Sequence, residues 1–167
     1  MTNGLFDDAD LAIFGNRPFT FKRKPLALPP DQRLSWRLPL LLITLKHVRS
    51  SKASFARLAL TTFALCNPSV LSRLTTALEK GHALDSLPTR YEPGLPFLLN
   101  FAFAKDLIRI GDHDQFALTE SGDAAAQRIE NSGTFDTELS FLREYGSKLN
   151  EAATNRIMSG GLFPDIV

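Results

Sequence analysis

The chain of 167 residues contains one cysteine, Cys66, so no disulfide bond can form within it. This composition favours a reducing compartment, with Cys66 as a small buried thiol. The first 14 residues hold three aspartates and no Lys or Arg, unlike a secretory signal peptide. The longest apolar run, residues 38–45, is far shorter than the roughly 20 residues that span a bilayer. We therefore expect a soluble cytoplasmic protein with no membrane segment.

Sequence motifs of catalysis and cofactor binding are also missing. The chain has no Walker sequence, no G-x-G-x-x-G pattern and no G-x-S-x-G pattern. Its three histidines, His47, His82 and His113, are far apart and have no partners at metal-ligand spacing. Asp112 and Asp114 flank His113, but they fall at the tip of an expected hairpin, where exposed polar residues are common. We predict no catalytic residue, no cofactor and no metal site, and therefore no enzyme.

Phenylalanine is abundant by contrast, with 13 residues against one Trp and two Tyr. Such rings belong in a core or at an interface. Charge is unevenly distributed: residues 15–74 contain eleven Lys or Arg and one acid, whereas residues 75–167 contain eight Lys or Arg and fourteen acids. A surface of one sign attracts a polyanion or an acidic partner. The alternative is that the two halves face each other and neutralise locally.

The most informative pattern lies in residues 95–130. A helix-length apolar segment, residues 95–105, precedes two short apolar runs joined by Gly-Asp-His-Asp, which is a hairpin signal. Thr119 then offers an N-cap hydroxyl to an alanine-rich helix. The sequence Lys-Asp-Leu-Ile-Arg-Ile, followed by Phe-Ala-Leu-Thr-Glu-Ser-Gly, resembles the wing of small bacterial winged-helix proteins. This resemblance implies a winged helix-turn-helix fold, mainly α-helical with a small β-hairpin.

The chain divides into an extended arm over residues 1–30, a winged-helix-like helical domain over 31–131, a C-terminal helix over 132–157 and a tail over 158–167. Prolines keep the arm extended or turning. Apolar residues step by three or four over residues 136–157, which predicts one long helix that Gly146 weakens only slightly. That helix would pack on its own domain or on a second copy, as in a homodimer.

The helices of the central domain are predicted from their ends and their apolar spacing. A first helix over residues 31–49, capped by Asp31, is apolar nearly all round and should be central, with Pro39 kinking it or resetting its start. A turn over residues 50–54 follows, in which Ser51 or Ser54 would cap a second helix through about Leu65.

A third helix is bracketed by Asn67 with Pro68 at its start and Gly81 at its end. After it, a linker contains Arg90 and Tyr91, which we expect in a short strand that joins the wing hairpin.

One functional hypothesis is a DNA-binding transcriptional regulator. Winged-helix domains commonly insert the helix before the wing into the major groove. Here that helix would be residues 95–105, whose polar side chains are Asn100 and Lys105, and the wing tip carries two carboxylates that would oppose phosphates. A basic groove could still hold the DNA backbone or an acidic partner. Its predicted residues, with Arg57 pointing away from the buried face of its helix, are Lys22, Arg23, Lys24, Arg37, Arg49, Lys52 and Arg57.

The hypothesis that we favour is a non-catalytic interaction subunit or adaptor of a bacterial multi-protein complex. In outline the chain is similar to the small winged-helix accessory subunits of SMC-type chromosome or defence ATPases, which implies a protein partner in a larger assembly. We predict that Phe97, Phe101 and Phe103 form the partner interface. The alternative is that these three rings are core residues of a larger domain.

Overall fold

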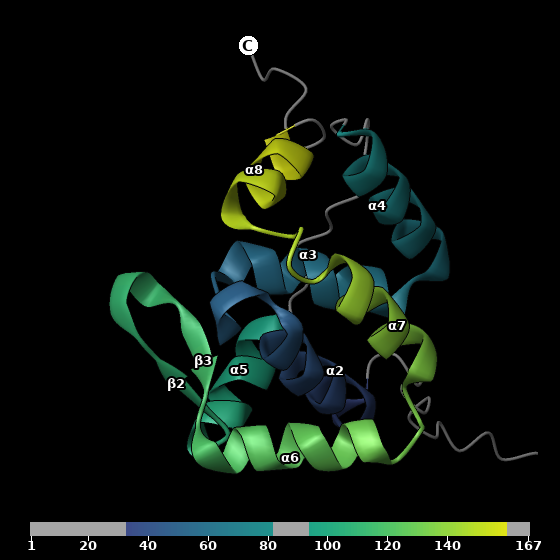
Figure 1. The fold of residues 1–167 in the computed structure, drawn as a ribbon. Coiled ribbons are helices and arrows are strands. Elements are labelled where there is room, and N and C mark those ends of the chain that lie inside the picture. Colours follow the sequence, from purple (N-terminus) through teal and green to yellow (C-terminus); the bar gives the residue numbers. More distant parts are fainter. Residues whose placement is uncertain (1–32, 82–93, 160–167) are drawn as a thin grey trace, which may run out of the picture.

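The structure, a computed structural model, describes residues 33–81 and 94–159. The predicted arm, the strand near Arg90 and Tyr91, and the tail beyond Ser159 lie outside these residues. The described part is mainly helical with a small antiparallel sheet, which confirms the predicted fold class (Figure 1). Its elements in chain order are α2 (Leu34–His47), the 3-10 turn η2 (Arg49–Ser51), β1 (Lys52–Ala53), α3 (Phe55–Cys66), α4 (Pro68–Lys80), α5 (Gly94–Ala104), β2 (Ile108–Ile110), the 3-10 turn η3 (Asp112–Asp114), β3 (Phe116–Leu118), α6 (Glu120–Asn131), α7 (Asp136–Tyr145) and α8 (Glu151–Ser159).

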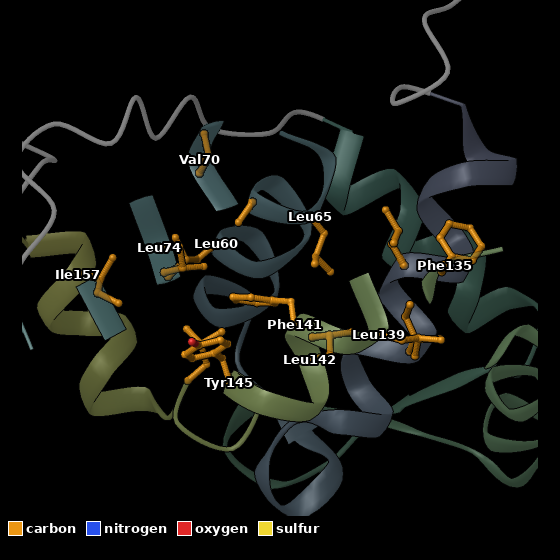
Figure 2. Close-up of a cluster of buried hydrophobic side chains, with 14 of the residues drawn as sticks. Leu60, Leu65, Val70, Leu74, Phe135, Leu139, Phe141, Leu142, Tyr145 and Ile157 are labelled. Carbon is orange, nitrogen blue, oxygen red and sulfur yellow. The ribbon is translucent and has the colours of Figure 1, made fainter. Parts of the chain in front are cut away.

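Helix α2 is central, as its apolar sequence predicts. It contacts α3, α5, α6, α7 and β3. Leu40 and Ile43 enter one buried cluster with α3, α4, α7 and α8 (Figure 2), while Leu41, Leu42 and Leu45 enter a second cluster with α5, the sheet and α6. Because consecutive residues of a helix point in different directions, a helix that is apolar on all sides can serve two cores at once.

The N-terminus of α2 differs from the prediction. The helix begins at Leu34, and its N-cap residue is Arg33, whose backbone is extended (φ −78°, ψ 138°) and whose side chain makes no capping hydrogen bond. Asp31, the predicted cap, is therefore not at the capping position.

The ends of α3 and α4 follow their local signals. The Ser54 hydroxyl accepts a hydrogen bond from the amide of Arg57, as the N-cap of α3. Asn67 and Pro68 begin α4, and Gly81 ends it in the left-handed conformation (φ 69°). The Asn67 side chain does not cap α4 but donates to the carbonyl of Phe63 in α3, at 2.7 Å.

The sheet has the order β1-β3-β2, with both pairs antiparallel. Strands β2 and β3 are the predicted hairpin, which projects from the helices (Figure 1). The third strand, β1, lies within residues 50–54, for which we predicted a turn. Ser50 and Ser51 do turn the chain, both with positive φ, and they deliver Lys52 and Ala53 to β3.

The predicted single C-terminal helix is wrong, because the chain breaks after α7. Gly146 packs its backbone against the carbonyl of His47, and a Cβ there would lie 2.7 Å from that oxygen. The break redirects α8 onto α3. Leu139 and Leu142 of α7 and Ile157 of α8 are buried in the first cluster (Figure 2). The apolar stripe that would have served a homodimer is thus covered by the chain itself.

Candidate functional site: the outer face of α5 and the wing

Helix α5 buries one side and exposes three aromatic rings on the other. Its inward residues are Leu95, Leu98, Leu99 and Ala102. The side chains of Phe97 and Phe103 are 66% and 57% exposed, and Phe101 is half-buried. We call Phe97, Phe101 and Phe103 the α5 outer face. The two buried clusters of the described residues do not include these rings. Within the described part of the chain, the three rings are therefore not all core residues.

The described charged side chains at the ends of α5 include both signs. The helix itself contains no acidic residue. The Lys105 ammonium lies 5.9 Å from the centroid of the Phe101 ring, which is a cation–π distance. At the other end, the Arg37 guanidinium packs against Gly94, where a Cβ would lie 3.4 Å from Cζ. Asp106 directly follows Lys105, at the C-terminal end of α5, and its side chain is exposed.

Hydrogen bonds at the base of the wing fix α5 to the hairpin and to α6. The amide of Thr119 donates to the carbonyl of Leu107 at 3.1 Å, and the amide of Leu107 donates to the carbonyl of Ala102 at 2.9 Å. The Thr119 hydroxyl donates to the carbonyl of Asp106 at 2.5 Å and accepts from the amide of Gly122 at 3.0 Å. A side chain on Gly122 would collide with the Leu107 carbonyl. Thr119 and Gly122 of the Thr-Glu-Ser-Gly sequence therefore hold the start of α6 against the segment between α5 and β2.

The wing tip is polar and exposed, as predicted. His113 and Asp114 have left-handed backbones, with φ of 58° and 54°, and both side chains face solvent. The amide of Gly111 donates to the carbonyl of Gln115 at 2.8 Å and closes the hairpin below the tip. An exposed carboxylate at this position disfavours contact with phosphates.

Four of the seven residues of the predicted basic groove lie in the described part of the chain: Arg37, Arg49, Lys52 and Arg57. Lys22, Arg23 and Lys24 lie outside the described residues. Arg49 and Lys52 are exposed beside β1, and Arg37 lies at α5. Lys52 lines an open depression of about 300 Å³ together with Arg109 of β2, which the sequence analysis missed, and with two carboxylates, Glu120 and Asp123. Basic residues of the first half of the chain thus lie beside acidic residues of the second half here, as the alternative of local neutralisation expects.

Arg57 is 3% exposed, so the prediction that it points away from the core is wrong. Its guanidinium donates to the carbonyl of Lys52 at 3.2 Å and to that of Gly146 at 3.0 Å. Burial lowers the pKa of Arg57, and the nearby carboxylate of Glu151 partly offsets this effect. Arg57 therefore joins β1 to the end of α7 and is not available to a ligand.

An apolar groove of about 350 Å³ between α2 and α6 was also not predicted. Leu38, Pro39 and Leu42 form one wall, and Ala125 and Ile129 form the other. Apolar spacing identified each helix, but it could not show that the two helices would leave space between them.

Two further observations concern metal binding and membrane insertion. Within residues 33–81 and 94–159, no three His, Cys, Asp or Glu side chains cluster in a way that could hold a metal ion. The His47 ring lies 2.5 Å from a carboxylate oxygen of Glu130. No helix in the same part of the chain has both the length and the apolar character needed to cross a membrane. No protein-family model, curated protein or solved structure matches the chain.

Proposed function

We propose that the protein is a non-catalytic winged-helix interaction subunit of a bacterial multi-protein complex, of the kind that accompanies SMC-type or defence ATPases. The observation that carries the proposal is the exposure of Phe97 and Phe103 on α5. Large aromatic side chains left in water are unfavourable, and they dominate the energetics of protein interfaces. Support for the winged-helix assignment comes from the order helix, strand, helices, hairpin, helix, and from the pairing of β1 with the hairpin strand β3.

DNA regulation is the second candidate, favoured by the exposed Arg49, Lys52 and Arg109 around the sheet. The helix before the wing opposes it, because phenylalanine rings cannot read base edges by hydrogen bonding. Glu120 and Asp123 beside Lys52 oppose it as well, since they repel phosphates.

Paired variants separate the two functions. Replacing Phe97 and Phe103 by Ser should abolish capture of a stoichiometric protein partner from the native host, measured by quantitative mass spectrometry. Ile110→Ser removes another exposed apolar side chain, 55% exposed on the wing, and should leave capture intact. Retained capture by the double Phe variant would refute the proposed interface.

DNA binding is tested by fluorescence anisotropy with labelled duplex DNA over a range of salt concentrations. Under our proposal, duplex binding is weak at physiological salt. Tight binding with a steep salt dependence, lost in a Lys52→Glu, Arg109→Glu variant and kept in the Phe variant, would favour the DNA regulator instead.

A further inference from the structure

The apolar groove between α2 and α6 has the size and the walls of a small-molecule site. The two helices pack against each other (Figure 1), yet a groove of about 350 Å³ remains between them. Ligand pockets have volumes of roughly 300–1,000 Å³ and mostly apolar walls. An apolar cavity of about 150 Å³ is already large enough for benzene. The groove therefore accommodates a ligand larger than one aromatic ring.

Small side chains account for the space between the two helices. Ala125 on the α6 wall has only a methyl group, and Pro39 on the α2 wall is a compact ring. The walls thus leave room that longer side chains would have filled. Because these apolar walls give water few hydrogen-bond partners, an aliphatic chain that displaces water from the groove gains free energy through the hydrophobic effect.

One lining residue, Arg128 of α6, offers a ligand a charged group. Among the described residues that line the groove, Arg128 carries the only charge, and Ser132 is the only other polar side chain. The Ser132 hydroxyl is engaged within the chain, since it donates to the carbonyl of Ile129 at 2.7 Å and accepts from the amide of Thr134 at 3.3 Å. The groove thus combines apolar walls with a single guanidinium.

The nearest acids of α6 lie on the other side of the helix from Arg128. Asp123 is 3.2 Å from the ammonium of Lys46, and Glu130 is 2.5 Å from the ring of His47. With 3.6 residues per turn, both acids are on the opposite face of α6 from Arg128. The positions three and four residues away from Arg128 hold no acid: they are Ala124, Ala125, Asn131 and Ser132.

Acids outside α6 leave the Arg128 guanidinium available as well. Asp136 directly follows the lining residue Phe135, but its side chain is exposed and does not line the groove. Within the described part of the chain, no carboxylate pairs with Arg128. A guanidinium binds a carboxylate through two parallel hydrogen bonds, so charge complementarity selects an anionic ligand.

We infer that the groove between α2 and α6 binds a single aliphatic chain that ends in a carboxylate, such as a medium-chain fatty acid. The chain lies between Leu38 and Leu42 of α2 and Ile129 of α6, and the carboxylate binds Arg128. The three rings of the α5 outer face do not line this groove. The inference is therefore separate from the proposed function and does not rest on it.

Trp36, the one tryptophan of the chain, reports on the groove, because the centroid of its ring lies 4.8 Å from that of Phe135, a lining residue. The full-length protein is titrated with decanoate below its micelle concentration, and Trp36 emission and isothermal titration calorimetry follow the binding. We expect saturable binding at one site.

Variants of the full-length protein test the role of each wall. Arg128→Gln should weaken decanoate binding about tenfold, because a charged hydrogen-bonded pair is lost, and should leave binding of the uncharged 1-decanol unchanged. Arg143→Gln, at an exposed position on α7 outside the groove, is the matched control and should bind decanoate like the native protein. Ala125→Phe fills the groove and should abolish binding of both compounds. Thermal unfolding checks that Ala125→Phe is folded, and Arg128→Gln decides the test if it is not.

Three results would overturn the inference. The first is the absence of saturable decanoate binding to the native protein. The second is equal affinity of the native protein and Arg128→Gln for decanoate. The third is loss of decanoate binding in the variant with Ser at positions 97 and 103, which would place the ligand on the α5 outer face instead of the groove.

Discussion

Glu151, the first residue of α8, accepts hydrogen bonds from both the amide and the hydroxyl of Ser54, the N-cap of α3, at 3.2 and 2.8 Å. The same hydroxyl accepts from the amide of Arg57 at 3.2 Å. One carboxylate therefore fixes the C-terminal helix to the start of a helix almost one hundred residues earlier in the chain.

Replacing Glu151 by Ala should lower the free energy of unfolding by about 1–2 kcal/mol, because two donors of Ser54 lose their acceptor. Urea denaturation measures the change. Glu120→Ala is the matched control, because Glu120 is also the first residue of its helix but is exposed. An equal loss in both variants would show that only the interaction with the helix dipole matters at Glu151.

Replacing Arg57 by Met should destabilise the protein by about 2 kcal/mol, because the buried Gly146 carbonyl loses its donor. Relief of the buried positive charge works in the opposite direction, as the lowered pKa of Arg57 indicates. We expect the lost hydrogen bonds to outweigh this relief, since methionine cannot donate to either carbonyl. Arg143→Met on the exposed side of α7 is the control. A higher melting temperature for Arg57→Met than for the native protein would contradict the prediction.

Sequence signals predicted the features that depend on neighbouring residues. Ser54 caps α3, Thr119 caps α6 and Gly81 ends α4, because each acts on a backbone group within a few residues of itself. The hairpin and the central place of α2 followed from apolar spacing in the same way. In the candidate site, the sequence identified the α5 rings but left open whether they are interface or core, since periodicity does not show what lies opposite a face.

Features set by distant residues could not be predicted. Lys52 and Ala53 become a strand because Ala117 and Phe116 pair with them. Arg57 is buried because two carbonyls far apart in the chain converge on it. Arg57 was assigned to the predicted basic groove because the members of that groove were grouped by their nearness in the sequence, which does not show burial.

Gly146 shows such a tertiary effect overriding helix propensity. Alanine is favoured over glycine in a helix by about 1 kcal/mol, which predicts that Gly146→Ala stabilises the protein. We expect destabilisation by about 2 kcal/mol instead, because the added methyl group would overlap the backbone of His47. Chemical denaturation shows whether Gly146→Ala raises or lowers the free energy of unfolding. Ser147→Ala, at the exposed neighbouring position, should change stability little, and a stabilised Gly146→Ala would show that the contact with His47 yields easily.

Tyr145 makes the stability of the folded protein depend on pH in the alkaline range. Its hydroxyl donates to a carboxylate oxygen of Glu79 at 2.6 Å, and this bond, with a contribution from Glu144, raises the pKa of Tyr145 above its usual value. A free tyrosine ionises near pH 10. Below about pH 10 both the folded and the unfolded chain keep this proton, so the contribution of Tyr145 to stability is fully present.

As pH rises above about 10, the unfolded chain releases the proton first, and this contribution declines. Tyr145→Phe should therefore be less stable than the native protein at neutral pH, and its stability should fall less steeply in the alkaline range. Urea denaturation at a series of pH values measures both slopes, and Tyr91, the other tyrosine, is the same in both proteins. Parallel pH profiles for the two proteins would mean that Glu79 does not hold the Tyr145 proton in solution.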